Sequence, residues 1–132
     1  MNPPRVAIVG ATGAVGHEFL RVLAERDFSM RSLKLLASAR SAGKTLSYAG
    51  EDHVVEALDE NSFRGVDLAF FSAGGGTSLE FAPKAVAAGC AVIDNSSAYR
   101  MHADVPLIVP EVNRTSMGQH QGILANPNCS TI

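Results

Sequence analysis

The segment NPNCSTI, residues 126–132, places a cysteine directly after an asparagine-proline turn. An apolar run precedes the turn, so the pattern is typical of a strand, a turn and the first residues of a helix, with Asn128 as the N-cap. A thiol in the first turn of a helix has its thiolate favoured by the helix N-terminus, and the thiolate is the nucleophile. Backbone N–H groups there can also stabilise an oxyanion. Cys129 is therefore our candidate catalytic nucleophile.

The other cysteine has a different setting. Cys90, in AAGCAVID, lies at the edge of a predicted buried strand, which indicates a small core residue. Two cysteines are too few for a disulfide framework, so we expect a reducing, cytoplasmic location.

Three glycines, Gly10, Gly13 and Gly16, follow an apolar run and open an amphipathic pattern. This G-x-x-G-x-x-G spacing has one glycine displaced from the dinucleotide-binding motif G-x-G-x-x-G. A tight turn and a close backbone approach require residues without a Cβ. The N–H groups of the following helix then face a pyrophosphate. We expect a dinucleotide site here; the alternative is a glycine turn that serves packing alone.

The end of the second predicted strand indicates which nicotinamide cofactor is used. NAD enzymes often carry an acidic residue there, which binds the ribose 2′-hydroxyl. Here LLASARSAGK contains no Asp or Glu and offers Ser38, Arg40 and Ser41. Hydroxyls and a guanidinium suit a 2′-phosphate, so we expect NADP. The alternative for Arg40 is a solvated loop charge.

Two further polar loops follow predicted strands, FSAGGG and DNSS. Ligands of open α/β sheets bind at the carboxyl ends of the strands. We therefore expect Ser72, Gly74, Gly75 and Asn95 to line the cofactor crevice. Turn formation is the alternative role for each of them.

The elements alternate in a way typical of an α/β protein. Apolar runs predict strands, and helical spacing of apolar residues predicts helices. Gly89 is expected just after the second helix, with Pro83 either kinking that helix or starting it. The predicted helices are 13–26 and 79–88. The predicted strands are 5–10, 32–38, 66–73 and 90–97, with further short strands within 106–113 and 122–128. A hairpin is expected around Gly50. We expect a Rossmann-type, mostly parallel sheet with helices on both faces.

Composition excludes several classes of protein. The 132 residues carry a net charge of −2 without a basic patch, which argues against nucleic-acid binding. No apolar run reaches the ~18 residues of a membrane span. The first predicted strand begins within a few residues of the N-terminus, which leaves no room for a signal peptide.

Taken together, these motifs resemble the aspartate-semialdehyde dehydrogenase family. The resemblance covers nearly the whole chain, in the family's order. N-acetyl-glutamyl-phosphate reductases are similar in plan but typically carry Gly where this chain has Asn128. The segments that carry the resemblance are GATGAVG (10–16), LASARSAGK (36–44), FSAGG (71–75), VIDNSSAYR (92–100), VPLIVPEVN (105–113) and NPNCSTI (126–132).

The resemblance implies an NADPH-dependent reductive dephosphorylation of L-aspartyl 4-phosphate to L-aspartate 4-semialdehyde and phosphate. This step belongs to lysine, threonine and methionine biosynthesis, with diaminopimelate on the lysine branch. Cys129 matches the family nucleophile, which carries the acyl group as a thioester. Arg100 matches the arginine that binds the substrate phosphate. The alternative for Arg100 is a surface salt bridge. Asn128 matches a residue that helps to hold the same phosphate. The backbone of Thr12, Gly13, Ala14 and Val15 matches the family's cofactor-phosphate site.

Family members are longer and continue into a second, α+β domain. That domain carries the acid/base histidine and most of a homodimer interface. None of the four histidines here lies in a matching segment, and we expect all of them at the surface. We therefore expect one dinucleotide-binding domain over 1–132, truncated at its C-terminus and inactive alone. The alternatives are a non-catalytic NADP-binding module and one half of a split dehydrogenase.

Overall fold

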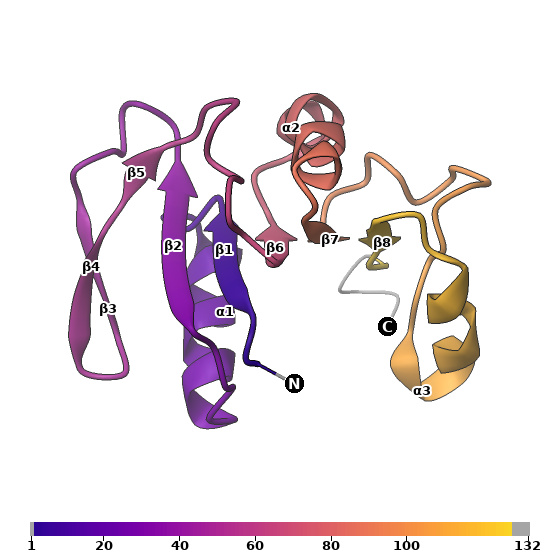
Figure 1. Cartoon of the computed structure of the whole chain (residues 1–132), viewed down its shortest axis with the longest axis horizontal. Coiled ribbons are helices and arrows are strands. Elements are labelled where there is room, and N and C mark those ends of the chain that lie inside the picture. The colour runs from indigo at the N-terminus through magenta and orange to yellow at the C-terminus, as the bar shows by residue number, and fades with distance from the viewer. Residues whose placement is uncertain (1, 128–132) are drawn as a thin grey trace.

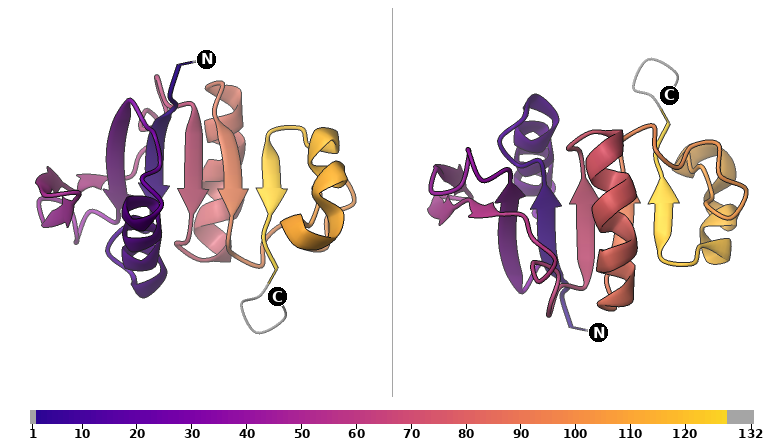
Figure 2. Two further views of the ribbon diagram at one scale, coloured as in Figure 1. Left: turned by 90° about the horizontal axis from the view of Figure 1, so that it is seen from below. Right: turned by 90° about the horizontal axis from the view of Figure 1, so that it is seen from above.

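A computed structural model describes residues 2–127 of the chain. Six parallel strands form one sheet in the order β5-β2-β1-β6-β7-β8. Helices α1 (Ala14–Glu25) and α2 (Gly75–Ala87) cover opposite faces of this sheet (Figures 1 and 2). The strands are β1 (Arg5–Val9), β2 (Ser32–Ala37), β5 (Glu56–Ala57), β6 (Leu68–Phe71), β7 (Ala91–Asp94) and β8 (Ile123–Ala125). The predicted α/β fold is confirmed.

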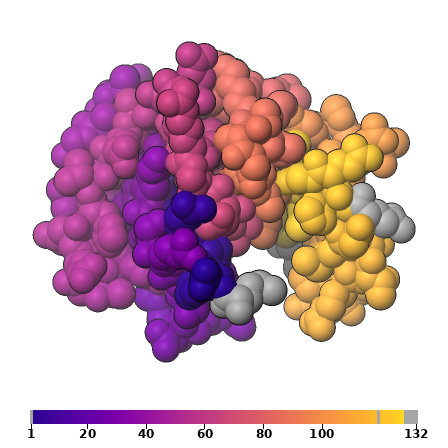
Figure 3. Space-filling view, viewed as in Figure 1, coloured from indigo at the N-terminus to yellow at the C-terminus, as the bar shows by residue number. Residues whose placement is uncertain are grey.

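The strand order reverses between β1 and β6. From β1 the chain builds outward through β2 and β5, and from β6 it builds the other way through β7 and β8. Figure 3 shows the result, with the last part of the chain gathered on one side of the molecule and the N-terminal strands on the other. A ligand crevice in an open α/β sheet forms at such a reversal, at the carboxyl ends of the strands.

The core lies on both faces of the sheet because side chains alternate along each strand. In β1, Ala7 and Val9 belong to the cluster beneath α2, which includes Phe63 and Phe71. Ile8, between them, belongs to the cluster beneath α1 with Leu20 and Leu35. A strand buried on both faces appears as a continuous apolar run, which is why RVAIV was recognisable in the sequence.

Helix α1 matches its predicted range, but its buried face is rotated. The apolar spacing of Val15, Phe19, Val22 and Leu23 predicts the buried stripe of this helix. Leu23 is buried as predicted, but Val15 and Val22 are 42% and 37% exposed, and Gly16 and Leu20 are buried instead. The small Gly16 lets the helix approach the sheet along this face.

Helix α2 begins earlier than predicted. Its N-cap is Gly74, and the helix continues through Pro83. The predicted alternative in which the helix begins at Pro83 is therefore wrong. Its end is as predicted. Gly89 has φ +91°, and the N–H groups of Gly89 and Cys90 donate to the carbonyls of Val86 and Ala85, both at 2.9 Å, which is a Schellman motif.

The antiparallel hairpin around Gly50 is confirmed as β3 (Thr45–Tyr48) and β4 (Glu51–Val54). The predicted strand within 106–113 is wrong. Leu107 makes a single bridge to Ala125, and a short helix α3 (Pro110–Asn113) follows, continued by the 3₁₀ helix η1 (Arg114–Gln119). Pro110 is at the first helical position, where its fixed φ favours a helix start.

Main-chain packing explains two of the three loop glycines. Gly10 has φ +85°, and a Cβ built on it would lie 2.7 Å from the Ser72 carbonyl oxygen. A Cβ on Gly16 would lie 2.6 Å from the Ala11 oxygen. Both contacts are closer than real Cβ atoms adopt, so the glycine loop, the first turn of α1 and the end of β6 fit together only with glycine at these positions.

A buried carboxylate joins α2 to the end of β7. Asp94 is fully buried and accepts hydrogen bonds from Ser78 Oγ at 2.8 Å, Ser96 Oγ at 2.9 Å and the Ser96 N–H at 3.0 Å. Ser78 lies in the first turn of α2, and Ser96 lies in the loop after β7. These bonds fix the start of that loop relative to the helix.

We expect Asp94→Ala to lower the free energy of unfolding by about 3 kcal/mol, because it leaves buried donors without an acceptor. Urea unfolding followed by circular dichroism measures the loss. Asp52→Ala, an exposed carboxylate on the hairpin, is the control and should change stability by less than about 0.5 kcal/mol. Equal unfolding midpoints for the two variants would contradict the role given to Asp94.

Candidate functional site

A cavity of about 490 Å³ lies where the strand order reverses, at the carboxyl ends of β1, β2 and β6. Five residues predicted from the motifs line it: Gly10, Thr12, Gly13, Ser38 and Ser72. The glycine loop and two of the predicted polar loops therefore meet at one hollow. The motifs predict the dinucleotide site at this position.

The N-terminus of α1 opens at this cavity. Its N-cap is Gly13, which offers no side-chain hydrogen bond, and its first turn carries no acidic residue. Within residues 2–127, the N–H groups of Ala14 and Val15 have no hydrogen-bond partner. Unpaired N–H groups and the positive end of the helix dipole together favour an anion such as a diphosphate.

Gly13 differs from the other two loop glycines. A Cβ built on it would meet the Gly10 oxygen at 3.5 Å, an ordinary van der Waals contact, and its φ of −80° suits any residue. Packing within the protein therefore does not require glycine at this position. Gly13 lines the cavity, where a phosphate approaching the main chain closely would need a residue without a Cβ.

The loop after β2 lies beside the glycine loop. Thr12 Oγ1 donates to Ser41 Oγ at 3.4 Å, and the Ser41 N–H donates to the Ser38 carbonyl at 2.9 Å in a turn. Arg40 is exposed in the same turn and makes no ion pair within residues 2–127. Arg40 and Ser41 share the turn with Ser38 but are not among the cavity walls. A guanidinium and two hydroxyls in one turn are groups that suit a phosphate.

The remaining cavity walls come from residues that the sequence analysis missed. Thr77 and Phe81 lie one turn apart on α2, and Leu58 follows β5, with its N–H donating to the Ala37 carbonyl at 2.8 Å. Thr77 and Phe81 are four residues apart, so a correct prediction of the start of α2 at Gly75 would have shown that they share one face of the helix. No local signal marks Leu58, because the sheet brings it to the cavity.

The predicted residues Gly74 and Gly75 lie at the start of α2 and are not among the cavity walls. A Cβ on Gly75 would lie 3.8 Å from Ser97 Oγ, so the start of α2 adjoins the DNSS loop.

A second polar group lies at the ends of β7 and β8. Arg100 Nε donates to the Asn126 carbonyl at 2.8 Å, and Arg100 Nη2 donates to the Asn95 carbonyl at 3.1 Å. Asn126 Nδ2 donates to Asn95 Oδ1 at 2.7 Å. Asn95 therefore lies in this group and not among the cavity walls. Within residues 2–127 Arg100 makes no ion pair, so the described residues do not support the alternative of a surface salt bridge.

The candidate nucleophile Cys129 and its neighbour Asn128 lie outside the described residues. Cys90 is described, and its predicted core role is confirmed. It is 2% exposed, and burial raises the pKa of its thiol to about 12, with the Asp67 carboxylate adding to the shift. Cys90 is therefore unreactive at neutral pH.

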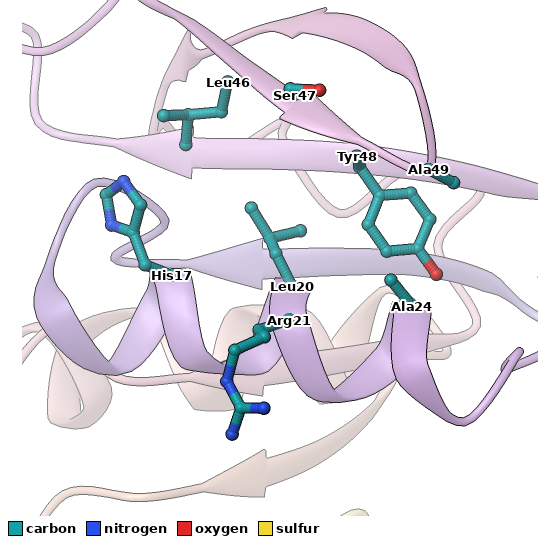
Figure 4. A pocket seen from close by; sticks show the side chains of 8 residues that line it. All are labelled: His17, Leu20, Arg21, Ala24, Leu46, Ser47, Tyr48 and Ala49. Atoms are coloured by element: carbon teal, nitrogen blue, oxygen red, sulfur yellow. The ribbon is translucent and has the colours of Figure 1, made fainter.

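Another hollow, of about 240 Å³, separates α1 from the β3 strand (Figure 4). His17 and Arg21 extend from α1, and the Tyr48 ring extends from β3 over Ala24. Arg21 is already engaged by Glu18 at 2.8 Å and by Glu25 at 2.6 Å. The guanidinium at this hollow is therefore already paired, and the lining is largely apolar.

Two other kinds of site are absent between residues 2 and 127. No three His, Cys, Asp or Glu side chains there lie close enough to hold a metal ion. None of the helices there is both long and apolar enough to span a bilayer.

Comparison with known proteins agrees with this geometry. The curated aspartate-semialdehyde dehydrogenase of Synechocystis sp. is 56% identical to this chain, and the match covers 99% of this chain and 39% of that protein. The curated protein of the same name from Aquifex aeolicus is 60% identical, and the match covers 97% of this chain and 38% of that protein. The chain thus spans about two fifths of the length of these relatives.

Solved structures show the same fold. Aspartate semialdehyde dehydrogenase II from Vibrio cholerae, complexed with ASA, superimposes with a TM-score of 0.95 at 49% identity, over 99% of this chain and 44% of that one. The enzyme from Candida albicans with NADP has a TM-score of 0.75 at 29% identity, over 97% and 43%.

A profile of the family described as "Semialdehyde dehydrogenase, NAD binding domain" matches residues 5–120, from β1 into the loop before β8. This range contains the glycine loop, the cavity walls and Arg100. The chain therefore belongs to the semialdehyde dehydrogenase NAD-binding domain family.

Proposed function

We propose that this chain is the NADP-binding part of an aspartate-semialdehyde dehydrogenase. The reaction is the reductive dephosphorylation of L-aspartyl 4-phosphate to L-aspartate 4-semialdehyde and phosphate. The observation that carries the proposal is the pairing of two sites on one sheet edge. A cavity suited to a dinucleotide lies at β1 and β6, and Arg100, which makes no ion pair within residues 2–127, lies at β7 and β8.

Residues of the cavity and of the loop beside it fit NADP. Gly13 and the first N–H groups of α1, which are unpaired within residues 2–127, suit the diphosphate. Ser38 lines the cavity, Arg40 and Ser41 lie in the same turn outside its walls, and all three suit the ribose 2′-phosphate. The structural relative with NADP supports the same assignment. When bound, NADPH supplies the hydride that reduces the acyl group.

The residues of this chain handle the acyl phosphate. The Cys129 thiolate attacks the carbonyl carbon, a C–S bond forms, and the C–O bond to phosphate breaks. Arg100 stabilises the leaving phosphate with the N–H groups that its two carbonyl contacts leave free. Asn128 is proposed to assist this binding. A module that merely binds NADP needs neither Arg100 nor Cys129.

The predicted homodimer and the cytoplasmic location stay predictions, as does the single-domain boundary at 1–132. The relatives' additional length leaves room for the acid/base histidine that the family resemblance implies.

The cofactor assignment is tested with Arg40→Glu. We expect this change to weaken NADP binding by about 10- to 100-fold, because it removes a charge-assisted contact to the 2′-phosphate, and to leave NAD binding nearly unchanged. Isothermal titration with each nucleotide gives both affinities. Arg26→Glu, at the far end of α1, is the matched control. Equal losses for NADP and NAD would refute the 2′-phosphate role.

The glycine loop is tested with a pair of alanine variants. Gly16→Ala should destabilise the fold by about 1–3 kcal/mol, because its methyl group meets the main chain of the loop. Gly13→Ala should unfold at the same urea concentration as the parent but bind NADP at least about tenfold more weakly, since its methyl group enters the cavity. Unchanged NADP affinity in Gly13→Ala would show that the diphosphate lies elsewhere.

The 132-residue chain should bind NADP without appreciable turnover. His17, His102 and His120 are exposed, His53 is half-buried in the hairpin, and none of the four lines the cavity. Missing acid–base assistance costs about 10²–10⁴-fold in rate. NADPH formation from the semialdehyde, phosphate and NADP is followed by absorbance, with one of the longer relatives assayed in parallel. Comparable turnover by the two proteins would contradict this expectation.

A further inference from the structure

We propose that Val55 is a positioning residue for cofactor selectivity. It fixes the base of the β3–β4 hairpin and thereby holds the turn over residues 38–41 in place to bind a 2′-phosphate. The proposal rests on the proposed function, because it takes this turn as the 2′-phosphate site. Val55 is not among the cavity walls and lies in none of the sequence motifs, so its role differs from direct binding.

The turn after β2 carries the groups assigned to the 2′-phosphate. The Ser41 N–H donates to the Ser38 carbonyl at 2.9 Å, and the Lys44 N–H donates to the Ser41 carbonyl at 3.3 Å. Within residues 2–127, its one hydrogen bond to the glycine loop joins Thr12 Oγ1 to Ser41 Oγ at 3.4 Å, which is long for two hydroxyls. The turn continues directly from β2 at its start, so its position depends on what holds its other end.

Val55 holds that end through its main chain. The Gly43 N–H donates to the Val55 carbonyl at 2.8 Å, and the Val55 N–H donates to the Lys44 carbonyl at 2.7 Å. These bonds lie just outside the β3–β4 ladder, which begins with Thr45 opposite Val54. Gly43 has φ +91°, a conformation that glycine favours, and it lies where the turn passes into β3. The end of the turn is therefore fixed on Val55.

The Val55 side chain fixes the hairpin base on the core. It is 1% exposed and belongs to the cluster beneath α1, together with Leu20 and Ala37. The residues after Val55 form β5, which pairs with the end of β2 at Leu36 and Ala37. Figure 1 shows the base of the hairpin and the carboxyl end of β2 at the same end of the sheet. The core and β2 thus hold the base beside the point where the turn begins.

Two glycines of the hairpin offer a matched pair of variants. Gly43 lies at the base and Gly50 at the tip, with φ +91° and +84°. Within residues 2–127, a Cβ built on either glycine meets no atom within 4 Å. Alanine therefore fits in space at both positions, but its backbone is strained at both. Only at Gly43 does this strain act on the end of the turn.

The test compares the affinities for NADP and NAD, which differ by the 2′-phosphate. A general loss of structure weakens both, so the ratio of the two dissociation constants reports the 2′-phosphate contact. Isothermal titration of the purified chain with each nucleotide gives this ratio. We expect Gly43→Ala to lower the preference for NADP about three- to tenfold, because a displaced turn loses part of a charge-assisted contact. Gly50→Ala should lower the urea midpoint similarly and keep the parent preference.

Val55→Ala tests the buried anchor. Losing two methyl groups loosens the hairpin base on the core, and we expect the preference for NADP to fall about as far as in Gly43→Ala. Val66→Ala is the matched control, because Val66 is also buried but lies in the cluster beneath α2 and precedes β6, away from the cavity. It should destabilise the fold comparably and keep the parent preference. Circular dichroism in urea checks that each variant folds, and Gly43→Ala, at an exposed position, decides the outcome if Val55→Ala does not.

The parent preference in Gly43→Ala or in folded Val55→Ala would overturn the proposal, and so would equal losses in the two controls. Failure of the proposed function is distinguished with Arg40→Glu. If the parent chain has no preference for NADP, or if Arg40→Glu retains it, the 2′-phosphate assignment itself is wrong and the positioning role falls with it. If Arg40→Glu lowers the preference and the hairpin variants do not, only the positioning role is wrong.

Discussion

The structure depends on two main-chain contacts that leave no space for a Cβ atom. Gly10 lies against the carbonyl of Ser72, and Gly16 lies against the carbonyl of Ala11, so the glycine loop joins β1, the start of α1 and the end of β6 without intervening Cβ atoms. Because the strand order reverses between β1 and β6, this contact also forms the cavity floor. Gly13, the N-cap of α1, lines this cavity, so the helix begins at the cavity wall.

The two halves of the sheet edge present different chemical groups. The half built from β1, β2 and β6 presents glycines and hydroxyls suited to a dinucleotide, and the half built from β7 and β8 presents a cation and amides suited to an acyl phosphate. Asp94 connects the halves, since its buried carboxylate fixes the start of α2 relative to the loop that leads to Arg100. Under the proposed function these halves would hold the cofactor and the acyl phosphate side by side, and such placement is a large part of catalysis.

Arg100 illustrates how one side chain can serve structure and chemistry together. Two of its N–H groups bind main-chain oxygens, and this fixes the plane of the guanidinium before any anion arrives. A lysine would supply the charge without the planar fork. The side chain is half-buried and lacks a carboxylate partner in residues 2–127, so its charge stays available to a ligand.

The sequence alone determined the parallel sheet, the glycine loop, the hairpin and the end of α2 at Gly89, because each follows from local periodicity or from a backbone conformation that glycine favours. The role of Cys90 also followed from its apolar neighbours. The start of α2 and the helix at Pro110 were missed, since glycines within a first turn and a proline at its start resemble a loop. Only the tertiary structure separated Gly13 from Gly10 and Gly16, brought Leu58 and Phe81 to the cavity, and paired Asn95 with Asn126. Those relations join residues distant in the sequence through the pairing of strands, which local patterns do not encode.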